Sequence, residues 1–163
     1  MSSIDEIRDA RIKKLELLKS KGFNPYPAES KREITLQQAV ENFDDLEKKE
    51  GEKWVAGRIM SIRGQGAIIF VTLYDGTASF QGLLKKDVIG EEKLNFWNEV
   101  IDIGDFVEIQ GTFFKTNRGE KTIEIKDWNM LSKDNLSIAY GVYILYVDAP
   151  GIGTKITKFA VIK

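Results

Sequence analysis

The sequence has no cysteine and no histidine among its 163 residues. A thiolate nucleophile, a histidine general base and a zinc site made of cysteine and histidine ligands are therefore excluded. The absence of cysteine is also typical of proteins in a reducing compartment, and we expect a cytoplasmic protein. The carboxylates are scattered without the spacing of a bound cation, so no metal or other cofactor is expected in this chain.

The sequence also lacks long apolar segments and an excess of either charge. No apolar run approaches the roughly 18 residues that suggest a membrane-spanning helix, so no contact with a membrane is expected. The charged N-terminus lacks the apolar centre of a signal peptide. Lys and Arg number 24 against 25 Asp and Glu. Because these charges balance, a nucleic-acid site would have to be a local basic patch.

Helical patterns dominate the N-terminal part of the chain. Residues 1–22 have apolar side chains at helical spacing, with Ser3 as the expected cap and Gly22 as the expected stop. Four basic residues interleave with the apolar stripe: Arg8, Arg11, Lys13 and Lys14. They form either an ordinary solvated face or a surface that contacts RNA phosphates, and the sequence leaves both interpretations open.

A second, shorter helix is predicted further along the chain. Thr35 is its expected cap, and its apolar side reaches about Phe43. Residues 44–53 are almost all charged, which favours an exposed loop. We therefore interpret residues 1–50 as an N-terminal helical extension.

From Trp54 onward the sequence has the pattern of short strands. Strands are predicted over residues 54–63, 67–74, 77–84, 106–116 and 121–130, with a helix over residues 87–101. Three strands, a helix and two further strands is the order of an OB-fold barrel, and barrel closure removes exposed strand edges. The predicted fold class is therefore mainly β. It is a five-stranded OB-fold barrel over residues 51–133, with a helix between strands 3 and 4, preceded by the helical extension.

The second predicted strand places an aromatic ring on its outer face. Its side chains alternate between a core face (Ala67, Ile69, Val71 and Leu73) and an opposite face (Ile68, Phe70, Thr72 and Tyr74). Arg63 precedes this strand and Gln81 lies on the next one. A flat ring, a guanidinium and an amide on one sheet surface suit single-stranded nucleic acid. The alternative is that Phe70 is a core ring and that Arg63 and Gln81 are ordinary surface residues.

Two turns are expected beside this surface, at residues 64–66 and 117–120. The second turn is bracketed by three basic residues: Lys115, Arg118 and Lys121. Together with Arg63 they are a candidate for the local basic patch that the overall charge does not reveal. The alternative is that these charges only keep an edge of the barrel soluble.

Five segments together resemble one known family. They are KSKGFNPYP, WVAGRIMSIRGQG, FVTLYDGTASFQ, DIGDFVEIQGTFFKTNRGE and WNMLSK. In this order and spacing they resemble the N-terminal anticodon-binding domain of class II lysyl-tRNA synthetases, from about Arg8 to Lys133. Aspartyl and asparaginyl enzymes share the barrel, but the PYP segment and the RGQG turn favour the lysine enzyme.

The resemblance implies contacts with the anticodon loop of a lysine tRNA. Phe70 would stack on the central uridine, and Gln81 and Arg63 would hydrogen-bond to the edge of that base. Glu120, in the far turn, would contact the third anticodon base. Arg58, in the matching Gly-Arg pair, is interpreted as structural. The implied function is a tRNA anticodon-binding module, and the implied partner is a lysine tRNA.

The resemblance also implies that the full-length enzyme is an ATP-dependent lysine–tRNA ligase. The catalytic domain, which would hold ATP and Mg²⁺, has no counterpart in this chain. We therefore expect no catalytic residues and no ATP–pyrophosphate exchange from this chain alone. The segment from Gly151 to Lys155 superficially suggests a phosphate loop but lacks the required spacing.

Residues 134–163 depart from the family pattern and are predicted to be an atypical apolar tail. Two strand-prone runs, residues 140–147 and 156–162, are separated by a turn. Either they form an added hairpin that packs on the barrel, or the tail is the product of a truncation or frameshift. The tail suggests a second function for the chain. It would be a protein-interaction domain, assembling as a homodimer or docking to a catalytic domain, with vestigial RNA binding.

Overall fold

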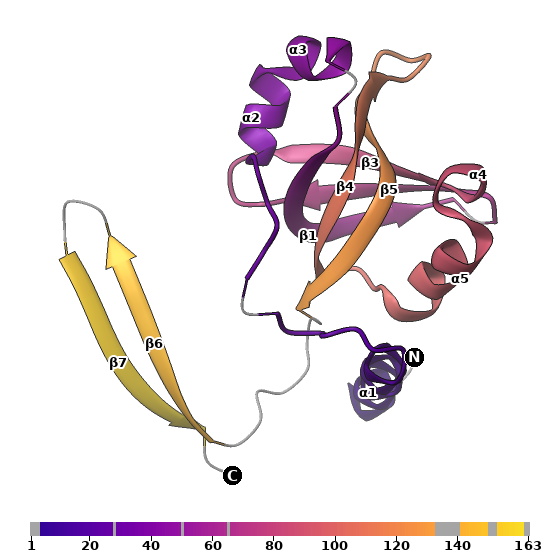
Figure 1. Cartoon of the computed structure of the whole chain (residues 1–163). Coiled ribbons are helices and arrows are strands. Elements are labelled where there is room, and N and C mark those ends of the chain that lie inside the picture. The colour runs from indigo at the N-terminus through magenta and orange to yellow at the C-terminus, as the bar shows by residue number, and fades with distance from the viewer. Residues whose placement is uncertain are drawn as a thin grey trace.

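The computed structural model describes residues 4–27, 29–49, 51–64, 66–132, 141–149 and 153–161. Among them, five strands form a closed barrel in the order β1-β2-β3-β5-β4 (Figure 1). The strands are β1 (Lys53–Arg63), β2 (Ile68–Tyr74), β3 (Ser79–Lys85), β4 (Phe106–Lys115) and β5 (Lys121–Ser132). Most neighbouring strands run antiparallel, and the parallel pairing of β3 with β5 closes the ring. The predicted fold class is confirmed.

The alternation of β2 sets the inner and outer faces of the barrel. Ile69, Val71 and Leu73 are fully or almost fully buried, whereas Phe70 is half-buried on the opposite face. This is the predicted phase. Ala67 is the exception, because β2 begins at Ile68 and Ala67 lies exposed in the preceding turn.

Two helices lie between β3 and β4 where the sequence predicts one. They are α4 (Lys86–Ile89) and α5 (Glu91–Val100). Gly90 separates them with a φ of +87°, a conformation that disfavours side chains and interrupts a helix. Trp97 of α5 is buried and meets Trp128 of β5 edge-on, with ring centroids 5.1 Å apart. The helices thus close one side of the core.

The N-terminal extension contains α1 (Ile4–Ser20), α2 (Leu36–Glu41) and α3 (Phe43–Lys48). Thr35 caps α2 as predicted, in a capping box with Gln38. The predicted cap of α1, Ser3, lies outside the described residues. The exposed loop predicted for residues 44–53 is wrong in its first half. Helix α3 forms there because Phe43 is fully buried between the rings of Phe80 and Phe113.

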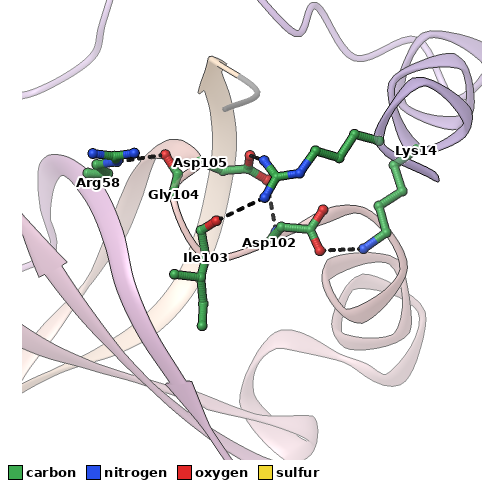
Figure 2. A network of polar contacts seen from close by, with 7 residues as sticks. Lys14, Arg58, Asp102, Ile103, Gly104 and Asp105 are labelled. Carbon is green, nitrogen blue, oxygen red and sulfur yellow. Dashed lines mark hydrogen bonds and ion pairs between the residues drawn. The ribbon is translucent and has the colours of Figure 1, made fainter. Parts of the chain in front are cut away.

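Helix α1 is joined to the barrel through the loop that precedes β4 (Figure 2). Nζ of Lys14 lies 2.6 Å from Oδ1 of Asp102, and Arg11 donates a 3.4 Å hydrogen bond to the carbonyl of Ile103. From the other side, Nε of Arg58 donates to the carbonyl of Gly104 at 3.1 Å. Arg11 and Lys14 therefore hold the extension in place, and Arg58 makes the structural contact that its interpretation implies.

The tail contains a two-stranded antiparallel sheet of its own. Its strands are β6 (Gly141–Ala149) and β7 (Gly153–Val161), paired from Gly141 with Val161 to Ala149 with Gly153. The two strand-prone runs therefore form a hairpin, as one alternative predicts. Residues 133–140, 150–152 and 162–163 lie outside the described residues, including part of the predicted turn. Packing of this hairpin on the barrel stays a prediction.

Candidate nucleic-acid interface

An open groove of about 990 Å³ runs over the outer face of the barrel. It lies over the end of β1, the middle of β2, the start of β3, and the turn between β4 and β5. Six of the seven predicted site residues line it: Arg63, Phe70, Gln81, Arg118, Glu120 and Lys121. The turn predicted at residues 64–66 forms one rim through Gly64, although Gln65 lies outside the described residues.

The strand registers bring three of these side chains together. Arg63 pairs with Phe70 across β1 and β2, and Gln81 pairs with Thr72 across β2 and β3. Residues 70 and 72 share one face of β2, so Phe70 and Gln81 lie on neighbouring positions of the same surface. Nη2 of Arg63 donates a 3.2 Å hydrogen bond to Oε1 of Gln81. The groove thus combines an aromatic face with a linked guanidinium and amide.

Gln81 has a second partner that the sequence did not reveal. Its Nε2 donates a 2.9 Å hydrogen bond to Oγ1 of Thr122 on β5. Thr122 stands opposite Gln81 in the parallel pairing of β3 with β5. The two residues are 41 positions apart, and no local sequence pattern predicts a parallel pairing at that distance. Strand alternation therefore could not identify Thr122 as a partner of Gln81.

The turn between β4 and β5 presents its side chains at the other rim. The amide of Gly119 donates to the carbonyl of Thr116 at 2.8 Å, and the amide of Thr116 donates to the carbonyl of Glu120 at 3.0 Å. Gly119 has a φ of +83°, which this tight turn requires and which a side chain disfavours. The turn leaves the side chains of Arg118 and Glu120 exposed beside the groove.

Lys115 is the predicted residue that the structure does not bring to the groove. Its Nζ lies 2.8 Å from Oδ1 of Asp44 and 3.7 Å from Oε2 of Glu47, both on α3. The hydrogen bond with Asp44 raises the pKa of Lys115 and, reciprocally, lowers the pKa of Asp44. Lys115 therefore holds α3 against the barrel.

Lys121 lines the groove, but its ammonium group is also engaged. Nζ donates a 2.9 Å hydrogen bond to the carbonyl of Val40 and lies 5.3 Å from the centre of the Phe43 ring. Arg63 and Arg118 are therefore the more available cations. The basic patch predicted from Arg63, Lys115, Arg118 and Lys121 is thus reduced mainly to its two arginines.

Two other features, a metal site and a membrane-spanning helix, are absent from the part of the chain that the structure describes. Within it, no three acidic side chains gather in a way that could hold a metal ion. None of the helices that the structure describes is long and apolar enough to cross a membrane.

Residues 53–131 match the family of OB-fold nucleic acid binding domains that includes tRNA anticodon-binding domains. The chain is 37% identical over 134 residues to a lysine–tRNA ligase of Thermotoga maritima, covering 80% of this chain and 27% of that protein. It is 40% identical over 132 residues to the lysine–tRNA ligase of Thermosipho melanesiensis, covering 78% and 26% respectively.

A third relative is lysine–tRNA ligase 2 of Methanosarcina mazei. It is 35% identical over 126 residues, covering 77% of this chain and 25% of the relative. The chain thus spans about a quarter of the length of these three curated relatives.

Proposed function

The chain carries an anticodon-binding OB-fold domain similar to that of lysine–tRNA ligases, and from this premise we propose that it reads the anticodon loop of a lysine tRNA. The observation that supports this most directly is the groove in which Arg63, Phe70 and Gln81 meet. Each supplies a different part of single-stranded RNA recognition: a flat ring, a cation and an amide.

Phe70 is the stacking platform in this proposal. Phe70 is half-buried and lines the groove, so the sheet holds its side chain beside the space that a base would occupy. Stacking of a base on such a ring is worth about 1–3 kcal/mol, and it tolerates any base. Phe70 would therefore supply affinity, and the choice of base would come from its neighbours.

Arg63 and Gln81 would make that choice at the central uridine. A guanidinium offers donors to the carbonyl groups of uracil, and an amide oxygen accepts from its imino group. On the opposite rim, Glu120 would contact the third base and Arg118 would contact the adjoining phosphates. Both sets of residues line the same groove of about 990 Å³.

We extend the proposal to lysine–tRNA ligase activity, which the names of the relatives describe. The chain would act in the cytoplasm as the tRNA-reading part of an ATP-dependent lysine–tRNA ligase. ATP and Mg²⁺ would be bound elsewhere in such an enzyme, and no cofactor is proposed for this chain. Docking to a catalytic domain or to a second copy of the chain would belong to that larger assembly.

The test is a titration of the full chain with a lysine tRNA anticodon stem-loop and with a copy whose central uridine is cytidine. We expect tighter binding of the uridine stem-loop. Phe70→Ala should weaken binding by about tenfold or more, the effect of losing a stacked base. Phe106→Ala removes an exposed ring on β4 outside the groove and should bind like the unmodified chain. Equal affinity for the two stem-loops would contradict the proposal.

A further inference from the structure

The amide of Gln81 is held at both ends in one orientation. Arg63 approaches Oε1 at 3.2 Å, and Oγ1 of Thr122 lies 2.9 Å from Nε2. A guanidinium has only donors, so the end of the amide that faces Arg63 must be the oxygen. The nitrogen end must then face Thr122. The two neighbours therefore agree on which way the amide points.

Thr122 is the fixed member of this arrangement. Its side chain is 0% exposed, and Oγ1 lies 3.1 Å from the carbonyl oxygen of Glu120. A hydroxyl has one proton, and a carbonyl can only accept it. With its proton directed to Glu120, the hydroxyl can only accept a hydrogen bond from Gln81. The buried hydroxyl of Thr122 thus determines which end of the Gln81 amide, a group that lines the groove, is the oxygen.

We propose that Thr122 is a positioning residue that sets the base preference of the groove, an inference that rests on the function proposed above. With Nε2 engaged by Thr122, Gln81 presents Oε1 to a bound base. The edge of uracil carries an N3–H donor, whereas cytosine carries a bare N3 acceptor at the same place. Because Oε1 of Gln81 cannot exchange positions with Nε2, it attracts the N3–H of uracil and repels the N3 lone pair of cytosine.

Arg63 cannot hold the amide in this way by itself. Its side chain is exposed at the end of β1, and in the proposed complex its guanidinium donates to the base. Thr122 stays buried in the β3–β5 seam throughout. Without its hydroxyl, the amide of Gln81 is free to rotate and offer Nε2 to the N3 atom of cytosine.

The test compares stem-loops with a central uridine or cytidine on variants of the full chain. Thr122→Val keeps the shape and removes the hydroxyl. We expect the preference for uridine to fall by about fivefold to tenfold, the factor that one neutral hydrogen bond carries. Thr122→Ser keeps the hydroxyl and should restore the preference. Thr112→Val, the same change at a half-buried position of β4 outside the groove, should keep it.

A measurement without RNA tests the geometry separately. The side-chain amide protons of Gln81 should exchange slowly with water in the unmodified chain and faster in Thr122→Val, as followed by NMR. Thermal unfolding shows whether each variant folds, and Thr122→Ala serves if the valine variant does not.

The outcomes separate this inference from the function on which it rests. A folded Thr122 variant without the hydroxyl that keeps the full uridine preference overturns the positioning role and leaves the proposed function standing. If the unmodified chain shows no preference for uridine, the proposed function is overturned, and so is the role of Thr122 in base preference.

Discussion

Asp75, in the turn between β2 and β3, shows how much one side chain contributes to this fold. Its Oδ1 accepts hydrogen bonds from the backbone amides of Thr77 at 2.9 Å and Ala78 at 3.2 Å, and from the Thr77 hydroxyl at 2.6 Å. Its Oδ2 accepts from the amide of Leu36 at 2.9 Å, at the start of α2. One carboxylate therefore closes a turn and attaches the extension to the barrel.

The pKa of Asp75 follows from this position. Partial burial acts to raise it, but the hydrogen bonds from Leu36, Thr77 and Ala78 outweigh burial, and the pKa lies below its ordinary value of 3.8. A lowered pKa in the folded state means that the carboxylate stabilises the fold fully above the unfolded pKa. This contribution is lost as the pH falls through the folded pKa.

Asp75→Asn should lower the free energy of unfolding at pH 7 by about 1–3 kcal/mol, because an amide cannot accept all four hydrogen bonds. The difference from the unmodified chain should begin to shrink as the pH falls below the unfolded pKa of about 3.9, and it should go on shrinking as the pH falls through the lower folded pKa. Denaturant unfolding at pH 7 and at pH 3 measures both values. Asp87→Asn, at an exposed position, is the matched control and should have little effect at either pH. A difference that is the same at both pH values would contradict this account.

At the residue scale, sequence and structure agree where the relevant pattern is local. The outward position of Phe70 follows from the alternation of β2, which needs only neighbouring residues. Lys115 and Thr122 do not follow from any local pattern. Lys115 meets Asp44 across 71 residues and Thr122 meets Gln81 across 41, so only the closed barrel reveals either contact.

At the scale of elements, α1 illustrates how an amphipathic helix attaches to a barrel. Its C-terminal part packs through the buried Leu18, and its middle is held by ion pairs to the loop before β4. Asp105 of that loop is fully buried, and its carboxylate lies 4.0 Å from Arg11. The basic residues of α1 thus divide between contacts with the protein and exposed positions.

Lys14→Ala should loosen α1 without unfolding the barrel. The Lys14 and Asp102 side chains are partly buried, so we expect a loss of about 0.5–1 kcal/mol. Hydrogen exchange should rise across residues 4–20 more than across the barrel strands. Lys13→Ala, an exposed position on the same helix, should leave the exchange pattern unchanged. A uniform rise across the whole chain would show that Lys14 supports global stability instead.

The length of the N-terminal helices was harder to predict than their existence. The acidic segment after Phe43 has the composition of a loop, yet it forms α3. Phe43 packs against Phe80 and Phe113, and Lys115 binds the carboxylates of Asp44 and Glu47. The acidic residues Asp44 and Asp45 also lie in the first turn of α3, where the helix dipole favours them. Tertiary contacts therefore decide the outcome in this segment.

At the scale of the whole molecule, the charges of the chain almost balance. The formal net charge is −1, and among the residues that the structure describes, those that are basic and line the groove are Arg63, Arg118 and Lys121. Several other lysines are paired with acids, including Lys85 with Glu124 and Lys93 with Asp127. Because few phosphates would be neutralised, binding of the stem-loop should depend only modestly on salt.

Arg118→Ala should reduce the slope of log affinity against log salt concentration by about 0.7–0.9, the value for one phosphate contact. It should weaken binding of the uridine and cytidine stem-loops by the same factor, because a phosphate contact carries no base information. Titrations at several salt concentrations measure the slope. Lys93→Ala, whose ammonium pairs with Asp127 outside the groove, should leave it unchanged. A loss confined to the uridine stem-loop would assign Arg118 to base recognition instead.

The parallel seam between β3 and β5 also bears on the order of events during synthesis of the chain. When β1, β2 and β3 have been made, Phe70, Arg63 and Gln81 all exist, but Thr122 does not. The seam joins residues 41 positions apart, so it cannot form before β5 has been made. A nascent chain that ends before β5 would hold the ring and the cation without the anchored amide. If Thr122 has the proposed positioning role, selective reading would therefore arise only once the last barrel strand is in place.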